Sequence, residues 1–160
     1  MSRLSESLGF VQLFEPVDKT ASALVSDAVN LGKFNSFTAY ISCGAITGDT
    51  VLTVYADATS AAATALTTAI AFKYRLSGGD FKAASADVFG EPTAVLATGL
   101  TMTAASFDHR TIAIEIDPDT LGSTPWVAFN MSAVGNPLLV SGVGIGEVRY
   151  PAHIQSTSLV

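Results

Sequence analysis

The chain has 160 residues and a mass of 16.5 kDa. This length suffices for one domain with a hydrophobic core and is short for two domains of ordinary size. Charged residues make up 14% of it, against a usual share of about 25%. The 8 Lys and Arg residues face 14 Asp and Glu residues, for a net charge of -6. These values argue against a disordered charged tail, a coiled coil and a nucleic-acid-binding protein, because an acidic surface repels a polyanion.

So few charges leave much of the surface to Ala, Thr, Ser and Gly. Charge and mixed polarity normally keep protein surfaces apart, so we expect another protein to cover part of this one. An ordinary soluble protein with a small-residue surface is the alternative. The sequence has no uninterrupted run of about 18 to 20 apolar residues that would indicate a membrane span. Residues 1–9 contain one Arg and no apolar stretch, which argues against a secretory signal peptide.

Short segments of strand-forming residues alternate with turn residues at intervals of roughly ten to fifteen residues, a spacing typical of all-β proteins. The expected strands cover residues 9–14, 23–26, 34–43, 50–56, 70–76, 93–97, 111–117, 126–131 and 138–148. Residues 57–69 are rich in Ala and Thr and are expected to form an ordered loop with room for one helical turn. Residues 81–92 are expected to be irregular. We therefore predict a single-domain β-sandwich of about eight strands, resembling a jelly roll.

The clearest strand signal is the alternation in residues 34–43. Phe37, Ala39, Ile41 and Cys43 fall on one face and make it mostly apolar. Residues 50–56 alternate in the same way after a turn at Thr47-Gly48-Asp49, so the two segments are predicted to form a hairpin-like pair. Cys43 is the only cysteine, which excludes an intrachain disulfide and predicts a buried structural thiol.

Two motifs resemble catalytic or nucleotide-binding signatures. Asp117-Pro118-Asp119-Thr120 follows a predicted strand, as does the Asp-x-Asp motif of aspartyl-phosphate phosphohydrolases, but Leu121 and the lack of alternating helices favour a turn. In Gly142-Val143-Gly144-Ile145-Gly146 the glycines are two residues apart, and no helix follows as a dinucleotide site requires. On a strand all three glycines share one face. We therefore predict that another backbone or a bulky side chain approaches that face closely.

Other chemistry-bearing residues are sparse. The segment 44–50 superficially resembles a phosphate-binding loop but lacks the Lys. His109 and His153 are the only histidines, lie far apart in loop-like segments and have no carboxylate at a diagnostic spacing. No Gly-x-Ser-x-Gly elbow is present. We therefore expect no catalysis, no metal and no cofactor, and Trp126 is expected to be a core or interface anchor.

Several stretches, taken in order, resemble small virion proteins of tailed bacteriophages that act as capsid decoration or cement proteins. These stretches are residues 37–49 (FTAYISCGAITGD), 51–56, 69–75 (AIAFKYR), 114–117 (IEID), Pro125-Trp126 and Arg149-Tyr150. Each is a pattern of strands and turns, and none is a catalytic signature. Together they span most of the chain.

The resemblance implies a protein that is made in the bacterial host cytoplasm and resides on the virion. It implies binding to the major capsid protein at the outer surface of the assembled capsid, often as a homotrimer, with no nucleic acid or membrane partner. In that picture residues 1–18 form an N-terminal arm that lies over a neighbour, and residues 19–160 form the β-sandwich. The candidate interface residues are Phe10, Val11, Leu13, Phe14 and Trp126.

Three alternatives remain open. Within virion proteins, the chain could be a tail, connector or fibre-associated subunit, which copy number per particle would distinguish. A carbohydrate- or host-surface-binding β-sandwich is the second, and it would use Trp126 or an exposed Tyr. A jelly-roll hydrolase is the third, although two histidines make a metal-dependent enzyme difficult to build.

Overall fold

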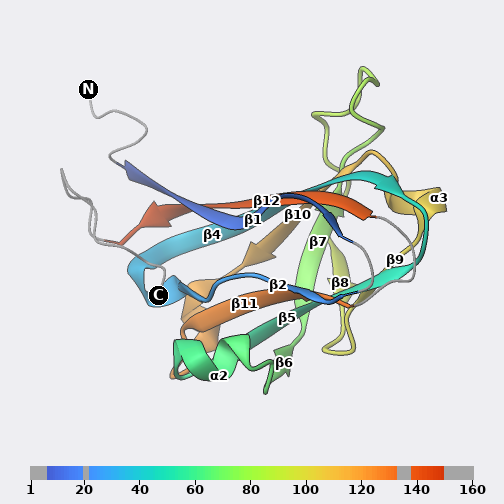
Figure 1. Cartoon of the computed structure of the whole chain (residues 1–160). Helices are drawn as coiled ribbons and strands as arrows, with labels where there is room; N and C mark the ends of the chain where they lie inside the picture. The colour runs from blue at the N-terminus through green and yellow to red at the C-terminus, as the bar shows by residue number, and fades with distance from the viewer. Residues whose placement is uncertain (1–6, 20–21, 133–137, 150–160) are drawn as a thin grey trace.

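The computed structural model describes residues 7–19, 22–132 and 138–149. These residues form two antiparallel sheets packed face to face (Figure 1). The first sheet has the order β1 (Leu8–Lys19), β12 (Leu138–Val148), β4 (Phe34–Ile46), β10 (Thr111–Ile116), β7 (Phe72–Leu76), β8 (Thr93–Val95). The second has the order β2 (Leu24–Val25), β11 (Trp126–Met131), β5 (Thr50–Asp57), β6 (Ala69–Ile70), with β3 (Val29–Asn30) beside β11 and β9 (Leu100–Met102) beside β5. Four short helical turns connect the strands: η1 (Leu31–Lys33), α2 (Ser60–Thr64), α3 (Ala104–Phe107) and η2 (Pro118–Leu121).

The strand pairing has the nested order of a jelly roll. β1 pairs with β12, β2 with β11, β4 with β10 and β5 with β6, as if one long hairpin had been rolled up. Rolling brings β12 against β4 and β11 against β5, which gives the two sheets. The strands β7, β8 and β9 are inserted between β6 and β10. The predicted all-β sandwich is confirmed, with twelve strands in the described residues.

The predicted hairpin of residues 34–43 and 50–56 is wrong. β4 and β5 lie in different sheets, and Thr47-Gly48-Asp49 carries the chain from one sheet to the other. The backbone N–H of Ile46 donates to Asp108 Oδ1 at 2.7 Å, which holds the end of β4 beside α3 instead of beside β5. Both strands alternate because each buries one face against the other sheet, and that pattern is the same in a hairpin and in a sandwich.

The predicted strand at residues 70–76 is also divided between the sheets. Ile70 pairs with Val54 in the second sheet, whereas Phe72 pairs with Val95 in the first. The chain therefore crosses the sandwich at Ala71. β9 and α3 had no counterpart in the sequence prediction, while α2 supplies the helical turn allowed within residues 57–69.

The core contains the apolar face predicted for residues 34–43. Phe37, Ala39, Ile41 and Cys43 are all buried, and the residues between them are more exposed. Burial raises the pKa of the Cys43 thiol to about 12, with the charge of Asp108 adding to the effect. The predicted buried structural thiol is confirmed.

The glycines of β12 lie against aromatic rings, as predicted. Gly142, Gly144 and Gly146 all face the core, where a Cβ at Gly142 would stand 2.8 Å from Phe14 and one at Gly146 2.5 Å from Phe34. The ring of Phe37 fills the corresponding space at Gly144. The glycines of β12, which have no side chain, thus leave space for large aromatic side chains on β1 and β4.

Residues 8–18 form most of β1 and are part of the sandwich, whereas the sequence indicated an arm over a neighbour. They pair with β12 from Leu8 opposite Glu147 to Asp18 opposite Leu139, with irregularities around Phe14. The pairing partner was missed because it lies at the other end of the chain, where no local pattern points to it. Residues 1–6 of the predicted arm lie outside the described residues.

Candidate interaction face

The outer surface of the first sheet carries a group of uncharged side chains over β1, β12 and β4. We call this group the apolar face. It consists of Phe10, Gln12, Leu139, Ser141, Val143, Ile145, Thr38, Tyr40 and Ser42. Most of these side chains are partly or fully exposed to solvent.

Strand register arranges the apolar face in rows across the sheet. Phe10 lies opposite Ile145, which lies opposite Thr38 on the far side of β12. In the next row, Val143 stands between Gln12 and Tyr40. Phe10 is 57% exposed and Leu139 is 47% exposed. Exposed apolar side chains gathered on one face mark interaction sites more often than scattered ones do.

Charged side chains lie around the apolar face. On the β10–β7 side of the sheet, Arg75 Nε donates to Glu115 Oε1 at 2.8 Å, and Lys73 lies opposite Glu115. Glu147 stands at the end of β12 near Leu8. An uncharged centre with a polar border is the usual anatomy of a protein–protein interface.

The loop at residues 77–92 borders the apolar face on one side. The ring of Phe89 packs edge-on against Tyr40 with 6.0 Å between centroids, and Arg75 Nη1 donates to Gly90 O at 3.1 Å. Phe81, which is 50% exposed, joins Leu139 and other residues around a depression of about 280 Å³. The depression is also lined by Pro16, Val17, Asp18, Ser42, Gly44, Val140 and Ser141.

The structure divides the predicted interface residues into three groups. Val11, Leu13 and Phe14 are buried in the core of their own chain, so in this structure they are not available to a partner. Phe10 is the exposed member of the β1 set. Trp126 is partly buried on the outer surface of the second sheet, where it packs against a cluster of Ala28, Ala63 and Ala128. It is therefore an anchor for α2 and offers little free ring surface for stacking a sugar.

The sequence prediction missed the β12 contribution to this face, although a signal was present. Because the three glycines face the core, Val143 and Ile145 between them must face outward. By contrast, Phe81 and Leu139 come together through the course of the 77–92 loop, which no sequence period describes.

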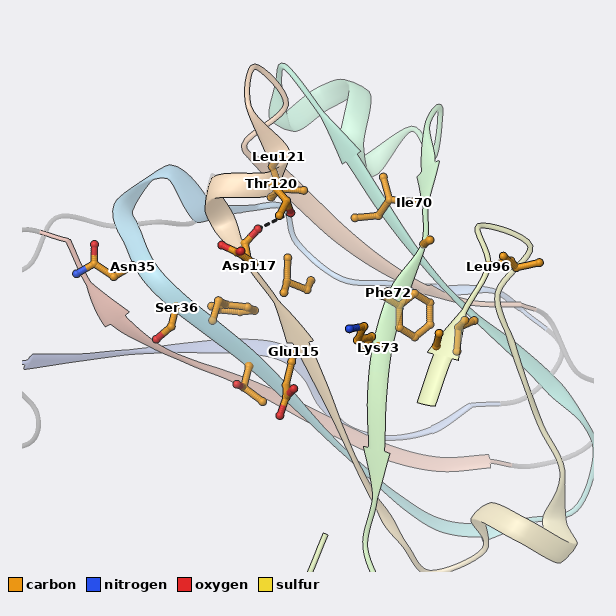
Figure 2. A pocket seen from close by; sticks show the side chains of 16 residues that line it. Asn35, Ser36, Ile70, Phe72, Lys73, Leu96, Glu115, Asp117, Thr120 and Leu121 are labelled. Atoms are coloured by element: carbon orange, nitrogen blue, oxygen red, sulfur yellow. Dashed lines mark hydrogen bonds between the residues drawn. The ribbon is translucent and has the colours of Figure 1, made fainter. Parts of the chain in front are cut away.

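A groove of about 750 Å³ lies where β7 enters the first sheet, and Thr38 of the apolar face stands at its border (Figure 2). Apolar residues of its lining include Phe37, Ile70, Phe72, Val95, Leu96, Ile116 and Leu121, and polar ones include Asn35, Ser36, Lys73, Glu115, Asp117 and Thr120. Its volume lies in the range of ligand pockets, roughly 300 to 1,000 Å³. No local sequence pattern predicts this groove, because its walls come from five separate parts of the chain.

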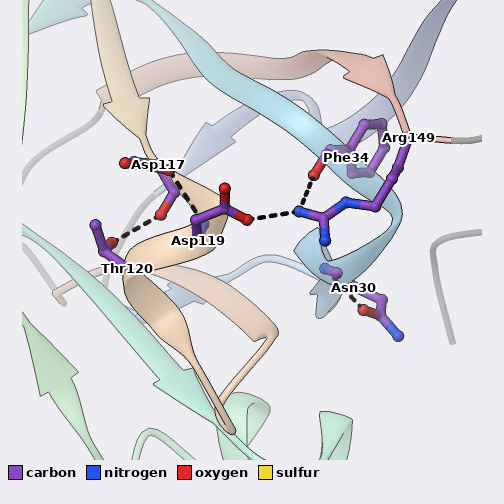
Figure 3. Close-up of polar contacts among 7 residues, drawn as sticks. Asn30, Phe34, Asp117, Asp119, Thr120 and Arg149 are labelled. Carbon is purple, nitrogen blue, oxygen red and sulfur yellow. Dashed lines mark hydrogen bonds and ion pairs between the residues drawn. The ribbon is translucent and has the colours of Figure 1, made fainter.

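The Asp117–Thr120 motif is a structural turn, as predicted. Asp117 Oδ1 accepts the N–H of Asp119 at 3.0 Å, and the Thr120 hydroxyl donates to the Asp117 carbonyl at 2.7 Å (Figure 3). Asp119 forms an ion pair with Arg149, with 2.7 Å between Oδ1 and Nη2. These contacts cap η2 and join it to the end of β12.

The remaining residues with possible chemistry are scattered. His109 is about half exposed, and its ring lies 6.3 Å from that of Phe81, centroid to centroid. His153 and the turn at Gly135-Asn136-Pro137 lie outside the described residues. Within the described ranges, no three His, Cys, Asp or Glu residues are placed to hold a metal ion. None of the helices in that part of the chain is long and apolar enough to cross a membrane.

Neither a protein-family model nor a curated protein sequence matches the chain. Among solved structures, the SPBc2 prophage-derived protein YomS is similar with a TM-score of 0.42 and 14% identity, over 87% of this chain and 93% of that chain. Two structures of infectious bursal disease virus, of the Gx and Gt strains, align with TM-scores of 0.13 and 0.14 and identities of 9% and 8%. Each alignment covers 90% of this chain and 41% of the viral chain. These values are too low to transfer a function to this chain.

Proposed function

We propose that this chain is a structural virion protein of a tailed bacteriophage that binds the outer surface of the assembled capsid and stabilises it, without catalysing a reaction. The partner in this proposal is the major capsid protein, and the protein acts as a homotrimer on the capsid surface. The resemblance of its strand and turn segments to decoration proteins suggests the class. The apolar face is the observation that carries the proposal, because it is a surface suited to another protein and contains no reactive group.

Stabilisation follows from selective binding. A protein that binds the assembled lattice and not its free subunits shifts the assembly equilibrium towards the lattice by mass action. Apolar area buried at the seams between capsid subunits supplies the free energy, at roughly 25 cal/mol per Å² before the cost of association. Several contacts in one oligomer then add through avidity, so that each of them can be weak.

The direct test is cosedimentation with capsids that lack the protein. Purified protein is mixed with expanded capsids or with free capsid subunits, and the bound fraction is measured. We expect binding to expanded capsids and little binding to free subunits. Equal binding to both would contradict lattice-specific stabilisation.

The apolar face is tested by the substitution Phe10→Lys, which places a charge on the edge strand β1 beside the uncharged Ile145 and Thr38. We expect the affinity for expanded capsids to fall about tenfold or more, since the charge must be desolvated on binding. Val25→Lys is the matched control, because Val25 is also exposed and apolar but lies on the second sheet. A similar loss of binding in both variants would place the contact elsewhere.

Copy number distinguishes the capsid shell from a tail, connector or fibre location. Quantitative mass spectrometry of purified virions gives the ratio of this chain to the major capsid protein. We expect a ratio of the same order as the number of lattice positions. A ratio typical of a tail or connector, with far fewer copies per particle, would contradict the proposal.

A further inference from the structure

β1 is the terminal strand of the first sheet, and within the described residues no strand pairs with the edge that faces away from β12, which we call the free edge (Figure 1). The second half of β1 carries features that keep the edges of natural sheets from pairing: two irregularities of register, Pro16, and the charges of Glu15 and Asp18. Residues 8–12 (LGFVQ) carry none of these, because their register with β12 is regular and they include no charge and no Pro. The first half of the free edge is therefore unprotected.

The hydrogen bonds of the sheet determine which backbone groups of β1 point to the free edge. In an antiparallel sheet both backbone groups of a residue point to the same neighbouring strand, and successive residues alternate between the two neighbours. The N–H of Cys43 donates to the Arg110 carbonyl at 2.9 Å, so the odd-numbered residues of β4 bond to β10 and the even-numbered ones bond to β12. Tyr40 lies opposite Val143. In β12, therefore, the odd-numbered residues bond to β4 and the even-numbered ones bond to β1.

The same alternation continues into β1. Val11 lies opposite Gly144, so the odd-numbered residues of the first half of β1 bond to β12. The backbone N–H and C=O groups of Leu8, Phe10 and Gln12 therefore point to the free edge. Their side chains lie on the outer surface of the sheet, where Phe10 is 57% exposed. These backbone groups form a template for one further antiparallel strand.

We propose that a second copy of the chain supplies this strand, with the two β1 strands antiparallel and Phe10 on a two-fold axis. Phe10 then lies opposite the partner's Phe10, and Leu8 lies opposite the partner's Gln12. Each of these pairs joins two residues whose backbone groups point to the free edge, so the paired residues exchange N–H···O=C bonds as in an ordinary antiparallel ladder. A two-fold contact needs a patch that is complementary to itself, and this register meets that requirement.

The charge of the chain favours this place for a contact between copies. Two chains of net charge -6 repel each other, but residues 8–12 are uncharged and bring no like charges opposite each other. Pairing also extends the rows of the apolar face, because the row of Thr38, Ile145 and Phe10 in one copy continues into the same row of the other. The two apolar faces then lie on one continuous sheet.

This inference does not rest on the proposed capsid role, because it concerns the free edge and is tested without capsids. The homotrimer of that proposal needs a three-fold contact at another surface. Pairing at β1 would join a chain of one homotrimer to a chain of the next.

Cysteines introduced into the full-length chain test the register. Leu8→Cys and Gln12→Cys are purified separately, mixed under mild oxidation and separated on non-reducing denaturing gels. In the proposed register the Cα atoms of Leu8 and the partner's Gln12 stand about 5.5 Å apart, a distance that a disulfide spans. The two copies of Leu8 stand roughly 13 Å apart along the strands. We expect covalent dimers in the mixture and little dimer from either variant alone, and equal yields in all three samples would overturn the proposal.

Phe10→Cys tests the position of the axis. This variant should form disulfide dimers by itself, because Phe10 lies opposite its own copy, and Cys43 does not compete because it is buried. Val25→Cys is the reference for random collision, since Val25 is exposed and lies on the second sheet. A dimer yield no higher than that of the reference would overturn the proposal. A photocrosslinker on Phe10→Cys that couples to capsid protein and not to a second copy would also overturn it, because another strand would then occupy the edge.

Sedimentation velocity measures the contact without a crosslink. Phe10→Lys places two like charges opposite each other across the axis, so we expect self-association to weaken about tenfold or more. Val25→Lys adds the same charge on the second sheet and should associate like the natural chain. Thermal melting establishes that both variants are folded. Equal self-association of the two variants would overturn the proposal.

Discussion

At the scale of single residues, the most informative positions are the three core-facing glycines of β12. They leave room for the rings of Phe14, Phe37 and Phe34, which are among the most buried side chains of the sandwich. Their spacing of two residues predicts that they share one face of a strand, and the absence of a helix signal after them argues against a dinucleotide-binding turn. Which rings fill the space could not be predicted, because the neighbours β1 and β4 are chosen by long-range pairing.

Gly144→Ala should destabilise the fold although Ala suits a strand better than Gly. The new Cβ would overlap the buried Phe37 ring, which would have to shift, and overpacking of this kind costs about 1–3 kcal/mol. Urea denaturation measures the effect. Ser141→Ala, on the outer surface of the same strand, is the control and should change stability by about 0.5 kcal/mol or less. Equal stability of the two variants would show that the core accommodates the added methyl group without a loss of stability.

Cys43 should be chemically silent in the folded protein. Its pKa of about 12 is raised, so the thiol stays protonated at neutral and mildly alkaline pH, and the thiolate is the nucleophile. We expect no reaction with a thiol-specific chromogenic reagent at pH 8, followed by one equivalent of reaction in denaturant. Rapid reaction of the native protein would contradict the burial of this residue.

At the scale of elements, local patterns predicted where strands lie and failed to predict which strands pair. The alternation in β4 and β5 is that of any half-buried strand, so it predicts a hairpin as readily as the observed arrangement of two strands in different sheets. The sequence pattern predicts one strand over residues 70–76 because Ala71, where the chain crosses between the sheets, is as apolar as its neighbours. Strand pairing depends on whether a turn returns the chain within one sheet or carries it across to the other sheet. A short turn such as Thr47-Gly48-Asp49 can do either.

The segment after β5 is held by Asp57, and this contact should depend on pH. Hydrogen bonds from the Thr67 hydroxyl, the Ala58 N–H and the Thr68 hydroxyl lower the pKa of this carboxyl, opposed in part by desolvation. Because the folded-state pKa is lowered, the carboxylate contributes stability above its unfolded pKa of about 3.9, and that stability is lost as pH falls through the folded value.

The variant Asp57→Asn tests this dependence. We expect it to be less stable than the natural chain at pH 6, with the difference shrinking as pH falls below about 4. Thermal melting over that pH range measures the effect. Asp87→Asn removes the same charge from the 77–92 loop and controls for net charge. A difference that stays constant down to pH 2 would contradict the assigned cause.

At the scale of the whole molecule, the low charge content and the jelly roll fit together. The described residues form twelve strands around one main core, and few charges are present to cover the outer surfaces of the two sheets. Their distribution leaves the apolar face over β1, β12 and β4, while Arg75, Glu115 and Lys73 border it on the same outer surface, over β10 and β7, with Glu115 opposite Thr38. A composition averaged over the chain predicts an interaction surface, and only the fold shows where the uncharged side chains gather.

Removing residues 1–18 should destabilise the whole domain. β1 covers one edge of the first sheet, and Val11, Leu13 and Phe14 contribute to the core. Burial of three such side chains is worth roughly 5–9 kcal/mol, which is comparable to the entire stability of a typical domain. A separate arm, as the sequence indicated, would leave the melting temperature nearly unchanged when deleted.

The deletion of residues 1–6 is the matched control, because it leaves β1 intact. We expect a cooperative thermal transition for that variant and a collapsed or absent transition for the longer deletion. A longer deletion that melts like the control would mean that β1 is dispensable and that its apolar residues serve a partner.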